Sequence, residues 1–180
     1  MFRERRQDRR EERRGGQDTV HYQMRQKLVS VGDDYWIEDD AGRRAYKVDG
    51  KALRVRKTLD FEDAHGNKLL KIQERMARVR DTMEIEDADG RNVATVKKAL
   101  FTPLRERMSV DVADGPDLEV QGNIVDHEYT IEADGSKVAE VSKRWFRVAD
   151  TYGVEIRPGQ NEVLLLAVTA VIDQMTSPDR

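Results

Sequence analysis

The chain has 180 residues, of which 37% are charged, and its formal net charge is only -3. This length suits one domain with a single core. So balanced a charge implies no bulk attraction to nucleic acid, so we expect no specific nucleic-acid partner, and any anion binding must come from a local patch. The absence of cysteine excludes disulfides, thiolate metal sites and cysteine catalysis.

The first nineteen residues differ in composition from the rest of the chain. Between Phe2 and Gly16 there are seven arginines and four acids without an apolar period. This pattern is typical of a charged, disordered tail. No apolar secretory segment follows Met1, so we expect a cytoplasmic protein without a signal peptide. The sequence therefore predicts a tail at 1–19, one barrel domain at 20–176 and a short tail at 177–180.

Two stretches of the chain repeat each other 24 residues apart. Residues 54–62 read RVRKTLDFE and residues 78–86 read RVRDTMEIE, with a looser third copy at 147–155. A fixed period of this size indicates one supersecondary unit that is used several times. The repeat therefore constrains the architecture more strongly than the activity.

The repeated unit has the pattern of a β-hairpin. Gly42, Gly66 and Gly90 follow the same 24-residue spacing, and each ends a short run that contains aspartate. Asp and Gly tolerate the left-handed backbone of tight turns, so these runs are expected to be hairpin tips. Apolar Met83 and Ile85 alternate with polar neighbours, which indicates a half-buried strand. Many such strands predict an all-β barrel or sandwich.

Asp126, His127 and Glu128 place an imidazole between two carboxylates. On a strand, His127 would face the same side as Val125 and Tyr129 and would point away from both acids. Neither neighbouring carboxylate can then orient the imidazole of His127, as the aspartate of a catalytic triad orients its histidine. We expect a half-buried histidine that is hydrogen-bonded within the barrel wall.

Trp145 and Phe146 are adjacent aromatic residues. Two adjacent side chains of a strand point to opposite faces, so both rings cannot be buried on a straight strand. We therefore expect a bend or bulge in the backbone near Lys143 and Arg144.

A continuous apolar run begins at Val163 and ends at Ile172. Asn161 is a suitable N-cap, Glu162 suits the first turn, and the polar pair at 173–174 is expected to end a helix of about 3–4 turns. A helix that is apolar all round must be buried, and ten residues are too few to span a membrane. A buried strand is the competing interpretation. The expected core residues of the helix are Val163, Leu164, Leu165, Leu166, Val168, Val171 and Ile172.

Enzyme motifs are absent from the sequence. It contains no G-x-S-x-G, P-loop, H-E-x-x-H or G-x-G-x-x-G pattern, so we predict no catalytic residue, no cofactor and no enzymatic activity. Asp87 and Asp89 at one expected hairpin tip leave calcium binding as a minor alternative. They lack the spacing of an EF-hand, so no metal site is predicted.

Four longer runs resemble the LURP-one-related proteins: GDDYWIE at 32–38, YKVDGKAL at 46–53, LEVQGNIVDHEY at 118–129 and VSKRWF at 141–146. The resemblance covers residues 22–175. It implies the tubby C-terminal-like fold, which phospholipid scramblases share: a twelve-stranded barrel around a hydrophobic C-terminal helix. Tubby proteins bind phosphoinositides, but no tubby phosphate-binding motif occurs here. Lipid binding is therefore implied only by analogy of fold.

Pairs of arginines in the repeats are the strongest candidates for a binding site. Arg54 and Arg56 would share one face of a strand, and so would Arg78 and Arg80. Guanidinium groups suit phosphate oxygens, so equivalent positions on neighbouring hairpins would form an anion-binding patch. Later cations extend this predicted patch: Lys97, Lys98, Lys143 and Arg144. The alternative is that all these side chains belong to ordinary solvated strand faces.

The sequence thus favours a non-enzymatic binding module, peripheral at a membrane, for anionic lipid headgroups or phosphorylated ligands. Its expected partner is an anionic phospholipid headgroup or a protein. The alternative is a protein-interaction or structural scaffold without a small-molecule ligand, which would agree with the balanced surface charge.

Overall fold

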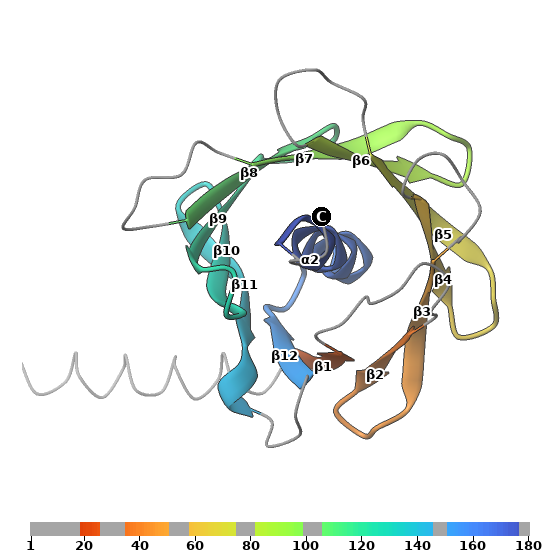
Figure 1. Ribbon diagram of the computed structural model, residues 1–180, viewed down its shortest axis with the longest axis horizontal. Coiled ribbons are helices and arrows are strands. Elements are labelled where there is room, and N and C mark those ends of the chain that lie inside the picture. Colours follow the sequence, from red (N-terminus) through yellow and green to blue (C-terminus); the bar gives the residue numbers. More distant parts are fainter. Residues whose placement is uncertain are drawn as a thin grey trace, which may run out of the picture.

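The protein is a closed β-barrel with one α-helix inside it (Figure 1). The structure, a computed structural model, describes residues 19–25, 35–50, 58–74, 82–98, 106–145 and 151–176. Twelve antiparallel strands follow one another around the barrel in chain order, and β1 closes the ring against β12. This architecture confirms the predicted barrel of hairpins around a C-terminal helix.

The elements have the following bounds: β1 (Val20–Arg25), β2 (Tyr35–Asp39), β3 (Arg44–Gly50), β4 (Thr58–Asp63), β5 (Lys68–Glu74), β6 (Thr82–Asp87), β7 (Asn92–Lys98), β8 (Glu106–Val112), β9 (Leu118–Asn123), β10 (Glu128–Ala133), β11 (Ser136–Ser142), the 3-10 helix η1 (Lys143–Trp145), β12 (Thr151–Ile156) and α2 (Glu162–Thr176).

Aspartates close three of the hairpin tips in the same way. The Oδ1 atom of Asp39 accepts hydrogen bonds from the backbone N–H groups of Ala41 and Arg43 at 3.0 and 2.9 Å. Asp63 and Asp87 occupy the equivalent positions 24 and 48 residues further on and make the same pair of contacts. These side chains satisfy backbone donors that the turn would otherwise leave to water. The predicted hairpin tips are therefore confirmed.

The repeats occupy equivalent places in the barrel. Thr58, Thr82 and Thr151 come from the three copies; they begin β4, β6 and β12, and all three are buried. The arginine-containing halves of the first two copies, residues 54–57 and 78–81, lie outside the described residues. Structural equivalence is thus shown for the second half of each repeat.

Inward side chains of the strands pack around α2. Met83 and Ile85 on β6 are buried, whereas Glu84 between them is only half-buried. On the helix, Leu165, Leu166 and Val168 are 3%, 0% and 0% exposed. Burial of apolar side chains from both the wall and the helix stabilises the fold, because each buried side chain of this size contributes roughly 1.5–3 kcal/mol.

The N-terminus of α2 is fixed by two polar contacts. The Oδ1 atom of Asn161 accepts the Leu164 N–H at 3.1 Å, as an N-cap does. The hydroxyl of Tyr22 on β1 donates to Oε2 of Glu162 at 2.5 Å. Burial and this hydrogen bond raise the pKa of Tyr22. Two of the predicted core residues, Val163 and Leu164, are only half-buried, since they lie in the first turn of the helix.

The C-terminal end of α2 differs from the prediction. Asp173 and Gln174 do not end the helix, which continues to Thr176. Asp173 is 2% exposed, because it faces a histidine of the turn between β9 and β10 instead of water. Within the described ranges, no helix is long and apolar enough to cross a membrane.

Candidate functional site

Four polar side chains meet inside the barrel near the C-terminal end of α2. We call them the buried polar cluster: His127 from the β9–β10 turn, Tyr129 from β10, Tyr152 from β12 and Asp173 from α2. The Nε2 atom of His127 lies 2.7 Å from Oδ1 of Asp173. The rings of His127 and Tyr152 are 4.4 Å apart between centroids, with 31° between their planes. Burial, and next the charge of Asp173, raise the pKa of Tyr129.

His127 does not lie on a strand, so its predicted placement was wrong. Residues 124–127 form a turn, and His127 has a left-handed backbone with a φ of 54°. Val125 is therefore 52% exposed, although alternation along a strand had grouped it with the buried Tyr129. The hydrogen-bond partner of His127 comes from the helix, whereas we had expected one within the wall.

The His127–Asp173 pair has the contact geometry of the orienting half of a catalytic triad. However, the two side chains are 5% and 2% exposed, and a catalytic base must reach its substrate within hydrogen-bond distance. In the part of the chain that the structure describes, no three or more His, Asp or Glu side chains form a group that could hold a metal ion. The geometry therefore favours a contact that joins the helix to the wall.

The predicted anion-binding residues fall into two groups. Arg54, Arg56, Arg78 and Arg80 lie outside the described residues, in the segments that join β3 to β4 and β5 to β6. Lys97, Lys98, Lys143 and Arg144 lie on β7 and η1. Lys97 forms an ion pair with Asp111 of the neighbouring strand β8. The described cations are thus at two separate places on the barrel.

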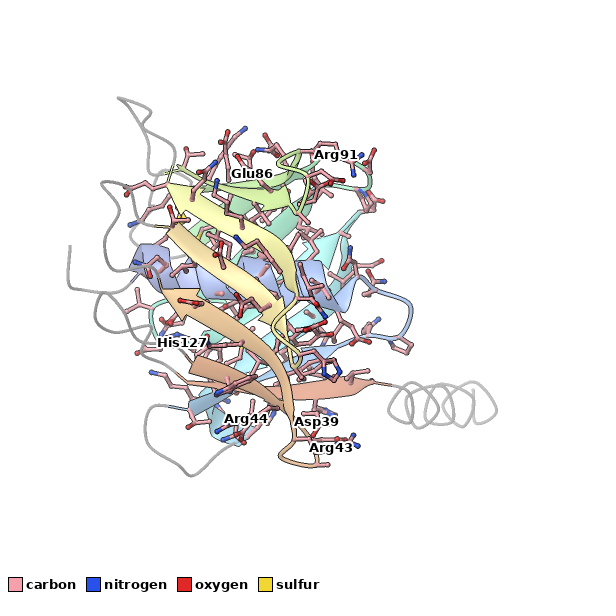
Figure 2. The ribbon with its side chains drawn as sticks, turned by 90° about the vertical axis from the view of Figure 1, so that its right-hand side faces the viewer. Asp39, Arg43, Arg44, Glu86, Arg91 and His127 are labelled. Atoms are coloured by element: carbon pink, nitrogen blue, oxygen red, sulfur yellow. The ribbon has the colours of Figure 1, made fainter. Side chains whose placement is uncertain are left out.

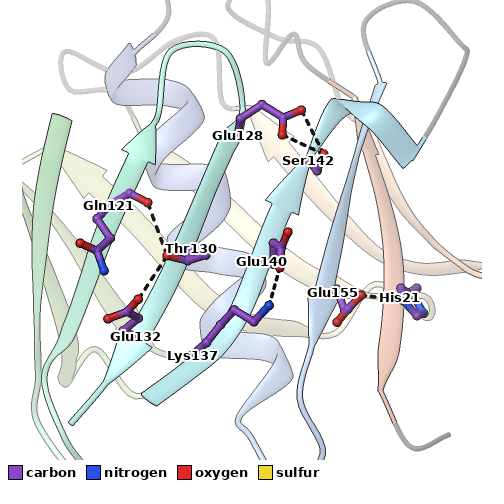
Figure 3. A network of polar contacts seen from close by, with 9 residues as sticks. All are labelled: His21, Gln121, Glu128, Thr130, Glu132, Lys137, Glu140, Ser142 and Glu155. Carbon is purple, nitrogen blue, oxygen red and sulfur yellow. Dashed lines mark hydrogen bonds and ion pairs between the residues drawn. The ribbon is translucent and has the colours of Figure 1, made fainter. Parts of the chain in front are cut away.

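Glu128 attaches η1 to the barrel wall (Figure 3). Its carboxylate accepts hydrogen bonds from the Ser142 hydroxyl at 3.0 Å and from the Lys143 N–H at 3.1 Å. The Nε atom of Arg144 lies 3.4 Å from the same carboxylate, although 83% of that side chain is exposed. These contacts fix the turn that begins where β11 ends.

The predicted bend before the aromatic pair is confirmed. Strand β11 ends at Ser142, and Lys143–Trp145 form a 3-10 helix. Trp145 is 40% exposed, and its ring meets the ring of His21 edge-on, with 6.4 Å between centroids. Phe146 lies outside the described residues.

The alternation of strand direction sorts the connecting segments between the two ends of the barrel. One end, which we call the tip end, receives the tight hairpin connections and the segment that leads into α2. These segments contain five aspartates and three cations: Asp40, Asp89, Asp114, Asp117, Asp134, Arg43, Arg91 and Arg157. Figure 2 shows Asp39, Arg43 and Arg91 toward this end and His127 toward the other.

The other six connections join strand ends at the opposite end of the barrel, which we call the basic end. They are residues 26–34, 51–57, 75–81, 99–105, 124–127 and 143–150. Their cations are Lys27, Lys51, Arg54, Arg56, Lys57, Arg75, Arg78, Arg80, Arg105, Lys143, Arg144 and Arg147, and their acids are Asp33, Asp34, Asp81, Asp126 and Asp150. The chain has a net charge of -3, but the segments joined to this end of the barrel contain more cations than acids.

Sequence reasoning missed two of these features. It interpreted Asp173 as a polar stop for the helix, because a single sequence does not show that an aspartate faces a histidine 46 residues earlier. It also grouped the arginines by strand face and did not group the connections by barrel end. Successive strands of a repeated hairpin alternate in direction, so every second connection falls at the same end of the barrel. This alternation was the sequence signal for the grouping of connections by barrel end.

Comparison with known proteins agrees with this architecture. A family model described as LURP-one-related matches residues 20–173. No curated protein matches the chain. An Arabidopsis thaliana protein with an X-ray structure superposes with a TM-score of 0.67 at 15% sequence identity, over 88% of this chain and 92% of that one. At this identity the superposition shows a shared fold only. On the strength of the family model, which spans nearly all of the described barrel, the chain belongs to the LURP-one-related family.

Proposed function

We propose that the protein is a non-enzymatic binding module that attaches to membrane surfaces through anionic phospholipid headgroups. The observation that carries this proposal is the sorting of charge between the two ends of the barrel. Twelve lysines and arginines against five aspartates belong to the segments at the basic end. An anionic surface attracts nearby Lys and Arg residues by about 1 kcal/mol each.

The arginines of the basic end suit this role, although the net charge of the whole protein is close to zero. Its planar guanidinium group presents paired donors to phosphate oxygens. Arg54, Arg56, Arg78 and Arg80 occur in two connections of equal length that share the sequence Arg-Val-Arg and flank equivalent strands. The repeat would therefore present two similar phosphate-binding groups at one end of the barrel.

Vesicle sedimentation tests this proposal. The protein should sediment with vesicles that contain phosphatidylserine, should not sediment with pure phosphatidylcholine, and should dissociate as salt rises to about 0.5 M, because salt screens exposed charges. Competition by soluble glycerol phosphate at millimolar concentration would assign the site to free phosphorylated ligands instead of a lipid surface.

A charge-matched pair of variants locates the site. Replacing Arg54, Arg56, Arg78 and Arg80 by Gln should weaken binding on the order of a thousandfold, since four contacts of about 1 kcal/mol are lost. The control replaces four cations of the tip end or its strands by Gln: Arg43, Arg91, Lys137 and Arg157. It changes the net charge equally and should keep nearly full binding. Equal losses in both variants would show bulk attraction only, and no binding by the wild-type protein would favour the scaffold alternative.

A further inference from the structure

Trp145 is exposed, although most of the large apolar side chains that the structure describes are buried. Among the described residues, two large hydrophobic residues are exposed: Trp145 at 40% and Val125 at 52%. Both belong to connections at the basic end: Val125 precedes β10 by three residues, and Trp145 follows β11 by three. The first residue of β10 and the last of β11, Glu128 and Ser142, are directly paired.

The turn that carries Trp145 is held in place before any partner binds. Glu128 accepts hydrogen bonds from the Ser142 hydroxyl and the Lys143 N–H, and the Arg144 N–H donates to the Ser142 hydroxyl at 3.1 Å. The ring of His21 on β1 packs edge-on against the Trp145 ring. The Nε2 atom of His21 lies 3.2 Å from Oε2 of Glu155 (Figure 3). Binding therefore needs little ordering of this turn, which lowers its entropic cost.

Lysine, arginine and tryptophan are consecutive on this turn, as Lys143, Arg144 and Trp145. Tryptophan favours the boundary between headgroups and acyl chains, because its ring is apolar and its N–H is polar. Neighbouring cations add attraction to anionic headgroups. At the tip end, by contrast, the hairpin connections and the segment that leads into α2 contain more aspartates than cations, so these connections add no net attraction to an anionic surface.

We propose that Trp145 is an interfacial anchor that docks the barrel, with its basic end toward the lipid, on a bilayer rich in anionic phospholipid. This inference rests on the proposed membrane-binding function and adds an orientation and an anchoring residue to it. The cations beside the ring, Lys143 and Arg144, select an anionic surface as the occupant, and the exposed Trp145 provides the apolar contact.

The chain has only two tryptophans, so their fluorescence can test this orientation directly. Trp36→Phe leaves Trp145 as the single reporter and keeps a ring beneath Arg44, whose guanidinium carbon is 4.6 Å from the Trp36 ring centroid. The control is the triple variant Trp36→Phe, Trp145→Phe and His65→Trp, which places the reporter on an exposed tip-end hairpin. Both are mixed with phosphatidylserine vesicles that contain a phosphatidylcholine brominated on its acyl chains.

Bromine should quench the fluorescence of Trp145 strongly and that of the His65→Trp control hardly at all. Trp145→Ala should weaken vesicle binding by about tenfold, since an apolar contact is lost. Trp145→Tyr should keep most of the affinity, because tyrosine also has an apolar ring with a polar tip.

Failure of this inference and failure of the proposed function are distinguishable. If the wild-type protein does not bind anionic vesicles at all, membrane binding itself is wrong, and the anchor with it. If it binds but Trp145 is not quenched, or the tip-end reporter is quenched equally, only the anchor and the orientation are overturned. Unchanged affinity of Trp145→Ala, with normal binding of the wild-type protein, would likewise contradict the anchor.

Discussion

The Nε2 atom of His127 lies 2.7 Å from Oδ1 of Asp173, and both side chains are buried inside the barrel. This contact joins the β9–β10 turn to the last turns of α2. Two polar groups in an apolar core stabilise the fold only while they satisfy each other, because an unsatisfied buried partner costs about 1–3 kcal/mol or more if it is charged.

Loss of either partner should therefore destabilise the protein. We expect His127→Ala and Asp173→Ala each to lower the free energy of unfolding by about 2–4 kcal/mol. In the double variant the two losses should be less than additive, with a coupling of at least about 1 kcal/mol. Urea unfolding of the four proteins measures this coupling, and strictly additive losses would show that the contact contributes nothing.

The central helix should not tolerate a charge in the core. Leu165 is 3% exposed, so Leu165→Asp would bury a carboxylate among apolar side chains and should prevent cooperative folding. Gln174→Asp introduces the same residue at a partly exposed position of the same helix and serves as the control. Circular dichroism during thermal unfolding should show a normal transition for the control only. A cooperative transition of Leu165→Asp at the wild-type temperature would contradict the packing of α2.

Gly122 should be irreplaceable for a steric reason. A Cβ atom at this position would lie 2.6 Å from the carbonyl oxygen of Glu128 and 2.8 Å from Cα of Tyr129, and its φ is 138°. Gly122→Ala must displace backbone atoms of β10, so we expect a loss of about 3 kcal/mol or more.

Gly42 is the matched control for this prediction. Its φ is 73°, but a Cβ atom there would meet nothing within 4 Å. Gly42→Ala should therefore lose only the cost of a left-handed backbone, roughly 1–2 kcal/mol. Comparable losses at both positions in chemical denaturation would show that the contact with β10 is unimportant.

The aspartates of the hairpin tips predict an acid-dependent loss of stability. The hydrogen bond from the backbone N–H of Arg43 lowers the pKa of Asp39, and the one from the backbone N–H of Arg91 lowers the pKa of Asp87. The contacts of Asn67 do the same for Asp63, with its side chain contributing most. A lowered pKa in the folded state gives stability that is present above the unfolded value, near 3.8, and is lost as pH falls through the folded value.

Replacing the three aspartates by Asn should reduce this dependence, because Asn keeps the acceptor oxygen but has no charge to lose. We expect the melting temperature of the variant to fall less steeply than that of the wild-type protein below about pH 4. Melting curves between pH 7 and pH 2.5 measure both slopes. Identical slopes would mean that other carboxylates govern acid unfolding.

The sequence by itself determined the features that depend on neighbouring residues. Each tip needs an aspartate and a glycine within five positions, strands need alternating side chains, and α2 needs an N-cap such as Asn161 before its apolar run. The same spacing of 24 residues revealed that the hairpin is repeated. These patterns predicted an all-β fold of hairpins and favoured a buried helix, because turn chemistry and side-chain periodicity can be recognised within a few neighbouring residues. The family resemblance indicated the twelve-stranded barrel.

Only the tertiary structure decided which distant residues meet. Nothing near Asp173 in sequence shows that it faces His127, and the left-handed backbone of His127 overrode the alternation expected of a strand. The exposure of Trp145 likewise depends on how Glu128 holds η1 against the wall. The separation of charge between the tip end and the basic end follows from strand direction around the closed ring. This separation arises only when strands distant in the sequence pair. The free energy of such pairing depends on contacts between segments, so no single segment of the sequence determines it.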